Sequence, residues 1–100
     1  MKYIVTVNAK TGYSDIRMAY IHNTQGEAYA AAKIEIEGKI LDGDSMEEDY
    51  FDQGNDLEED LEDFDKDGKF VFEGFGTSLE VKVVKKQDSK AEAFVTAFES

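Results

Sequence analysis

The feature that most constrains the fold is a strongly acidic segment in the middle of the chain. Residues 42–67 contain 14 of the 23 acidic residues and a single base, Lys66, so this segment carries a formal charge of −13. The other 74 residues sum to +1. So dense a run of like charges repels itself and is costly to bury. A folded body is therefore expected from the flanking sequence, with the acidic segment as an insertion between its two halves.

The sequence before the acidic segment predicts two strands and a helix. Residues 2–8 and 15–22 each carry apolar side chains at every second position, Tyr3, Val5 and Val7 in the first and Ile16, Met18 and Tyr20 in the second. The short connection between them favours an antiparallel hairpin. Residues 24–27 read Thr-Gln-Gly-Glu, the pattern of a helix capping box. A helix of roughly four turns is expected to follow, with Gly38 as a candidate end. Its apolar face comprises Tyr29, Ala32, Ile36 and Ile40.

The sequence after the acidic segment repeats this pattern. Residues 69–75 and 78–86 are two further β-type runs joined by a glycine-containing turn. Residues 89–92 form a second capping box, and Ala91, Phe94, Val95 and Phe98 have the spacing of a terminal helix. We therefore predict an α+β fold for one domain over residues 1–100. Its four-stranded, mostly antiparallel sheet follows the order ββα, acidic insertion, ββα, with the helices packed on one face.

The insertion itself has an apolar stripe. Leu57, Leu61 and Phe64 are spaced i, i+4, i+7 among acidic residues, which predicts a short amphipathic helix over about residues 55–65. Met46, Tyr50 and Phe51 are candidates for further anchors to the body. Residues 43–54 can be ordered or mobile on this reasoning, because like charges four residues apart destabilise a helix.

Composition excludes several classes of function. The chain has no Cys, which removes disulfides and thiolate chemistry. No apolar run approaches the ~20 residues of a membrane span, so a cytoplasmic location is expected. The localised negative charge repels nucleic acid and anionic lipid alike, so neither is an expected direct ligand. The expected partner is a basic protein, and the oligomeric state is not predicted.

The sequence offers no catalytic constellation, so we do not expect an enzyme. The single histidine, His22, ends a predicted strand, and neither a Ser-His-Asp arrangement nor a phosphate-binding glycine loop is present. Carboxylates are abundant. In an exposed acidic run, however, they lack the apolar surroundings that raise a carboxyl pKa for acid catalysis.

The acidic segment can instead imitate a nucleic-acid backbone. B-DNA carries one charge per ~1.7 Å of its axis, and an acidic helix with acids at over half its positions carries one per about 3 Å. A basic cleft that binds phosphates would also accept carboxylates at such a spacing, which predicts a competitive inhibitor. The candidate contact residues are Asp44, Glu47, Glu48, Asp49, Asp52, Asp56, Glu58, Glu59, Asp60, Glu62, Asp63 and Asp65, with Tyr50 and Phe51 as aromatic contacts.

In size, charge and lack of Cys, Trp and Pro, the chain resembles the small acidic DNA-mimic inhibitors that phages and plasmids encode, including anti-restriction and anti-CRISPR proteins. The resemblance covers composition and residues 42–67. Those proteins have unrelated folds, so the likeness implies a strategy and transfers no functional residue. What it implies is inhibition of a basic DNA- or RNA-binding host-defence or nucleoid protein by occupation of its nucleic-acid cleft.

Two alternatives remain open on the sequence. Residues 63–70 match the first eight positions of an EF-hand loop, with Asp63, Asp65 and Asp67 as candidate Ca²⁺ ligands. Position 12, where a bidentate Glu is required, is occupied by Gly74. The second alternative is a plain protein-interaction domain whose acidic insert maintains solubility.

Overall fold

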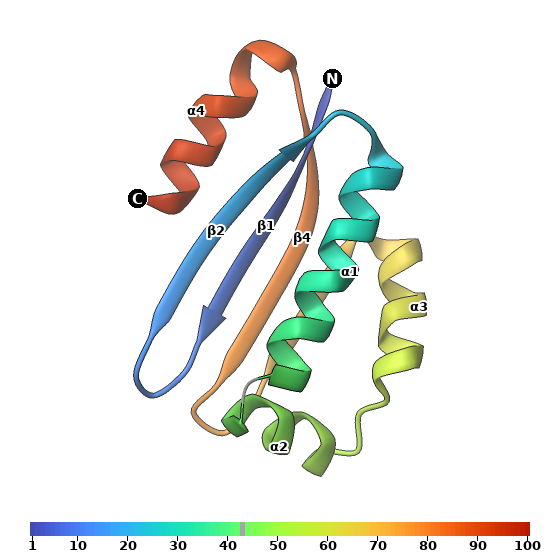
Figure 1. Ribbon diagram of the computed structural model, residues 1–100, viewed down its shortest axis with the longest axis vertical. Coiled ribbons are helices and arrows are strands. Elements are labelled where there is room, and N and C mark those ends of the chain that lie inside the picture. The colour runs from blue at the N-terminus through green and yellow to red at the C-terminus, as the bar shows by residue number, and fades with distance from the viewer. Residues whose placement is uncertain (43) are drawn as a thin grey trace.

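The computed structural model describes the backbone of residues 1–42 and 44–100, and the side chains of all these residues except 42, 44 and 45. The structure confirms the α+β fold and the order ββα, insertion, ββα, with the insertion forming two helices (Figure 1). The elements are β1 (Lys2–Lys10), β2 (Asp15–His22), α1 (Gln25–Asp42), α2 (Asp44–Asp52), α3 (Leu57–Asp67), β3 (Lys69–Glu73), β4 (Ser78–Lys86) and α4 (Asp88–Glu99).

The two predicted hairpins join edge to edge to form one sheet. The strand order is β2-β1-β4-β3, and each neighbouring pair is antiparallel. β1 and β4 pair along their whole length, from Lys2 opposite Lys86 to Lys10 opposite Ser78. These two strands are the central ones, and residues 4–7 of β1 are buried on both faces of the sheet.

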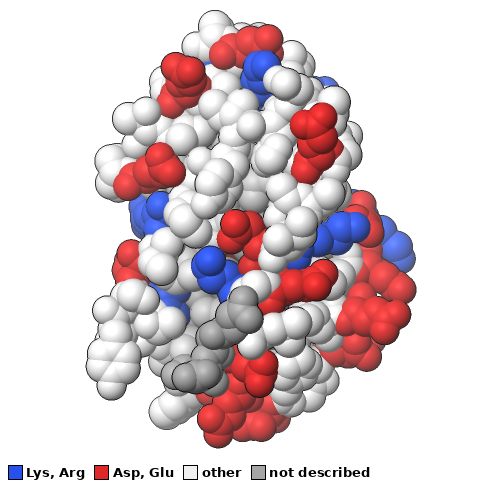
Figure 2. Space-filling view, in the orientation of Figure 1, with Lys and Arg blue, Asp and Glu red and all other residues white. Residues whose placement is uncertain are grey.

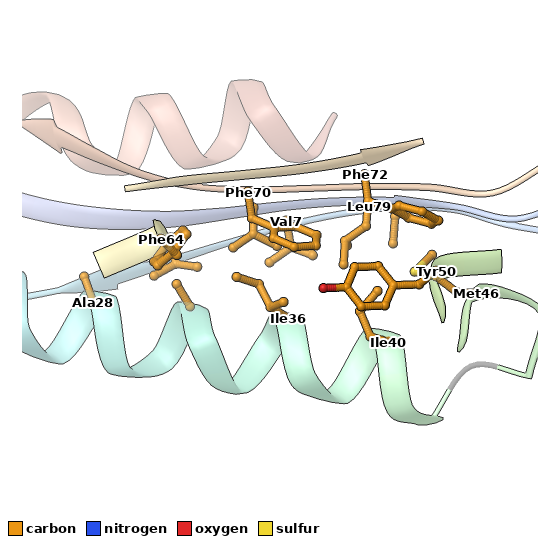
Figure 3. Packing of buried hydrophobic residues seen from close by; sticks show 14 residues of the cluster. Val7, Ala28, Ile36, Ile40, Met46, Tyr50, Phe64, Phe70, Phe72 and Leu79 are labelled. Carbon is orange, nitrogen blue, oxygen red and sulfur yellow. The ribbon is translucent and has the colours of Figure 1, made fainter. Parts of the chain in front are cut away.

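The expectation that the helices pack on one face of the sheet is wrong for α4. Helices α1, α2 and α3 cover one face, whereas α4 lies on the other face, over β1 and β2 (Figures 1 and 3). The cause is the consecutive apolar run in β1. Val5 points toward α1, and its neighbour Ile4 points the opposite way and packs with Ala91 of α4.

Predicted helix boundaries also differ from the structure. α3 spans Leu57–Asp67, whereas a helix over about residues 55–65 was predicted. α1 does not end at Gly38 but continues to Asp42, because Ile40 belongs to the buried core. The first capping box is supported, since the Glu27 N–H donates to Thr24 Oγ1 at 3.2 Å. The second is not formed. The N-cap of α4 is Gln87, and Ser89 lies inside the first helical turn.

The main core joins the acidic insertion to the sheet. Figure 3 shows Tyr50 between α1 and the sheet, beside Phe72 and Leu79. Met46 and Tyr50 of α2 and Phe64 of α3 are buried in this cluster, as predicted. The prediction that Phe51 is a further anchor is wrong, since this side chain is exposed. Both acidic helices are therefore part of the packed structure. Among the helices the structure describes, none combines the length and apolar character needed to cross a membrane.

Candidate acidic interaction surface

The amphipathic pattern of α3 fixes the direction of its carboxylates. Phe64 is fully buried against Tyr29 of α1, with ring centroids 5.4 Å apart. Four acidic residues on the outer side of the helix are exposed: Glu58, Glu59, Glu62 and Asp63. The helix is capped at both ends. Asp56 accepts a hydrogen bond from the Glu59 N–H at 3.2 Å, and the Gly68 N–H donates to the Phe64 carbonyl at 2.8 Å.

Seven of the predicted contact carboxylates form what we call the acidic surface. Each is exposed, and within the part of the chain that the structure describes none of them takes part in a side-chain hydrogen bond or an ion pair. Figure 2 shows acidic side chains gathered over α2 and α3, at the bottom and lower right of the view. The acidic surface comprises Glu47, Glu48 and Asp52 on α2, with Glu58, Glu59, Glu62 and Asp63 on α3.

Three other predicted contact carboxylates are engaged within the protein. Asp49 accepts a hydrogen bond from Thr77 Oγ1 at 2.9 Å, which attaches α2 to the β3–β4 turn. Asp60 accepts from the Tyr50 hydroxyl and connects α3 to α2. The Asp65 carboxylate pairs with Lys33 Nζ through both oxygens, at 2.9 and 3.1 Å. These groups position the helices, and Asp56 has a similar role as the α3 cap. Asp44 lies outside the residues whose side chains are described.

The two predicted aromatic contacts have different positions. Tyr50 is only 1% exposed and belongs to the core, so it is not available to a partner. Its neighbour Phe51 is 43% exposed. Adjacent helical residues point about 100° apart, and Met46, four residues before Tyr50, shares its buried face. Burial and the hydrogen bond to Asp60 raise the pKa of Tyr50 well above its usual value.

The EF-hand alternative is contradicted by the backbone. Asp63, Asp65 and Asp67 lie in the last turns of α3, not in a loop, and Gly68 ends the helix in a left-handed conformation with φ 66°. Residues two apart in a helix point to nearly opposite sides, so Asp65 faces Lys33 and cannot converge with the other two. Within the described residues, no group of three or more acidic or histidine side chains is arranged to hold a metal ion.

A groove beside α3 was not foreseen from the sequence. It lies between α1 and α3 and has a volume of about 420 Å³; we call it the α1–α3 groove. Ile34, 71% exposed, is the most exposed apolar side chain in it. The pattern that could have revealed it is a second apolar stripe on α1, Ala30, Ile34 and Leu41, on the side away from Ile36 and Ile40.

The other flank of α3 is an open surface formed only by charged residues. This surface comprises Asp56, Glu58, Glu59, Glu62, Asp63 and Lys66.

Comparison of the chain with known protein families, with curated proteins and with solved structures found no match. The chemical character of these surfaces is therefore the basis for inferring function.

Proposed function

We propose that the protein is a nucleic-acid mimic that binds a basic DNA- or RNA-binding protein through the acidic surface and blocks its nucleic-acid cleft. The observation that carries this proposal is the acidic surface itself. Seven carboxylates without a partner among the described residues project from two helices that are fixed to a packed core. A basic cleft that draws affinity from neutralising phosphates gains similarly from neutralising carboxylates.

The attachment of the helices favours binding over a merely solubilising role. A charged tail loses conformational freedom when it binds, which weakens the complex. Here Met46, Tyr50 and Phe64 hold the backbone in place beforehand, and the contacts of Asp49, Asp60 and Asp65 fix the helices to their neighbours. Only the outward side chains remain to be ordered. The localised charge also accelerates association with a cationic partner, by an amount that falls as salt is added.

The proposal is tested with two variants that each remove four negative charges, one from the acidic surface and the other from elsewhere on the protein. Glu58→Gln, Glu59→Gln, Glu62→Gln and Asp63→Asn together remove four charges from the acidic surface. The matched control, Asp15→Asn, Glu27→Gln, Glu73→Gln and Glu92→Gln, removes four charges from exposed residues elsewhere. Each tagged protein is incubated with nuclease-treated bacterial lysate, and the retained proteins are eluted with duplex DNA or with rising salt.

We expect the unmodified protein and the control to retain a basic nucleic-acid-binding protein that duplex DNA displaces, and the α3 variant to lose it. Retention that is equal for the two variants would contradict the proposal. A captured protein that duplex DNA does not displace would also contradict it, because a DNA mimic and DNA must compete for the same cleft.

A further inference from the structure

The α1–α3 groove combines an apolar floor with a charged rim. Ala30 and Ile34 of α1 and Leu61 of α3 supply the apolar atoms, and α1 and α3 lie side by side (Figure 1). Single exposed apolar residues are common on protein surfaces and need no explanation. Ile34 differs from such a residue because it lines a hollow together with apolar side chains of two helices. The rim comprises Lys33, Glu37, Glu58, Glu62 and Asp65.

The charges of the rim indicate what can occupy the groove. Lys33 is already paired with Asp65, which leaves Glu37, Glu58 and Glu62 without an ion-pair partner among the described residues. An occupant must therefore be apolar along its centre and basic along its flanks. A second copy of this chain does not meet that requirement, since each copy carries a net charge of −12.

The walls of the groove indicate the conformation of the occupant. Both walls are helices, whose backbone groups already bond within each helix, so they offer no free sheet edge to an extended peptide. A helical segment satisfies its own backbone and needs only side-chain contacts from the groove. Along α1 the groove is lined from Ala30 to Glu37, which corresponds to ~10 Å or about two helical turns.

We propose that the α1–α3 groove receives an amphipathic basic helix of the partner, with apolar residues against Ile34 and Leu61 and with lysines or arginines beside Glu37, Glu58 and Glu62. This inference rests on the proposed function, because it concerns the same basic partner. It adds that recognition includes burial of apolar side chains in a defined place. Charge alone does not account for such a contact.

The test uses two synthetic peptides of about 14 residues with the same numbers of leucines and lysines. In the amphipathic peptide the leucines recur at i, i+3, i+4 and i+7, and in the scrambled peptide they are spread around the helix. Affinities for the protein are measured by calorimetry at two salt concentrations. We expect the amphipathic peptide to bind about tenfold more tightly, the factor expected from burying one or two apolar side chains.

Substitutions then locate the binding site. Ile34→Ser should remove the advantage of the amphipathic peptide, while Ile21→Ser should preserve it, because Ile21 is an exposed isoleucine on β2, outside the groove. Circular dichroism verifies that both variants are folded. The α2 variant Glu47→Gln, Glu48→Gln lies outside the groove lining and should weaken both peptides by the same factor.

The possible results separate the two proposals. Equal, salt-sensitive binding of both peptides would overturn the groove proposal and leave the acidic surface supported. An amphipathic peptide whose affinity is unchanged by Ile34→Ser would also overturn it. If neither peptide binds even at low salt, both proposals fail together.

Discussion

At the scale of single residues, the hydrogen bond between Tyr50 and Asp60 shows how the acidic helices are held. The Tyr50 ring packs against Phe72, with centroids 5.4 Å apart, and its hydroxyl reaches the carboxylate of Asp60 on α3. One side chain thus contributes to the core and also connects the two acidic helices. The dense charge of the acidic segment suggests that the Asp60 carboxylate is solvated. In the structure this carboxylate instead connects two helices.

Tyr50→Phe should lower the free energy of unfolding at pH 7 by about 1 kcal/mol, the usual net value of one hydrogen bond. The ring remains, so the core packing is kept. Phe51→Leu is the control, because the neighbouring aromatic residue is partly exposed and makes no such bond among the described residues. Urea unfolding measures both variants, and an equal loss of stability in the two would contradict the role of the hydroxyl.

The raised pKa of Tyr50 also predicts a dependence of stability on pH. Above the ordinary tyrosine pKa of 10.0, the unfolded chain releases this proton while the folded protein keeps it. The stability linked to the group is therefore complete below pH 10 and is lost as the pH rises further. Tyr50→Phe lacks the group, so its unfolding free energy should fall less steeply between pH 10 and higher values. Parallel pH profiles for the two proteins would refute this.

At the scale of elements, α3 depends on its C-terminal cap. Gly68 has a φ of 66°, which strains any residue with a side chain, and a Cβ there would lie 2.6 Å from the Tyr29 hydroxyl oxygen. The Tyr29 hydroxyl is at the end of a side chain and can shift, so the backbone conformation is the larger cost. This glycine allows the chain to turn from α3 into β3 within one residue.

Gly68→Ala should destabilise the protein by about 1 kcal/mol or more. Gly26→Ala is the matched control. Gly26 lies in the first turn of α1, has open space around its Cα, and does not have a positive φ, so an alanine there should be neutral or stabilising by up to about 1 kcal/mol. Thermal unfolding of both variants distinguishes these cases, and equal midpoints would show that the cap is unimportant.

The elements also show what the sequence could predict. Alternation of apolar residues predicted β2 and β4 with their observed bounds, because this local pattern decides which residues can lie in a half-buried strand. The placement of α4 was missed, since it depends on how two hairpins join. The run from Ile4 to Val7 did contain the information that β1 is covered on both sides.

The residues of the candidate site also differ in whether the sequence could predict their roles. The four residues of the acidic surface on α3 follow from charge and helical spacing. Helix α2, which carries the other three, was not predicted, because repulsion between like charges left residues 43–54 open to order or mobility. The internal roles of Asp49, Asp60 and Asp65 depend on Thr77, Tyr50 and Lys33, which are between 10 and 32 residues away in the sequence. Nothing local in the sequence distinguishes these three carboxylates from the others.

At the scale of the whole molecule, the charge opposes folding. The net charge of −12 is concentrated at α2 and α3, and the cations pair with only a few of the described carboxylates. Repulsion between the carboxylates is relieved when the chain expands, so the folded state is destabilised at low ionic strength. Salt shortens the range of this repulsion to ~10 Å at 0.1 M.

The melting temperature should therefore rise as NaCl is increased from millimolar concentrations to 0.3 M, because screened repulsion outweighs the loss of a few surface ion pairs. Glu47→Gln, Glu48→Gln, Asp52→Asn should raise the melting temperature at low salt and reduce its dependence on salt. Scanning calorimetry at several salt concentrations measures both effects. A melting temperature that falls with added NaCl would contradict this account.

The double use of α2 and α3 has an evolutionary consequence. Their inner sides close the hydrophobic core: Tyr50 of α2 packs on Phe70 and Phe72, and Phe64 of α3 packs on Tyr29 of α1, so deletion of either helix would open the core. Their outer carboxylates take no part in that closure, so mutation can exchange them one at a time while the protein continues to fold. Under the proposed function, a lineage carrying this scaffold could therefore retune its target preference as the target diversifies, with little loss of its own stability.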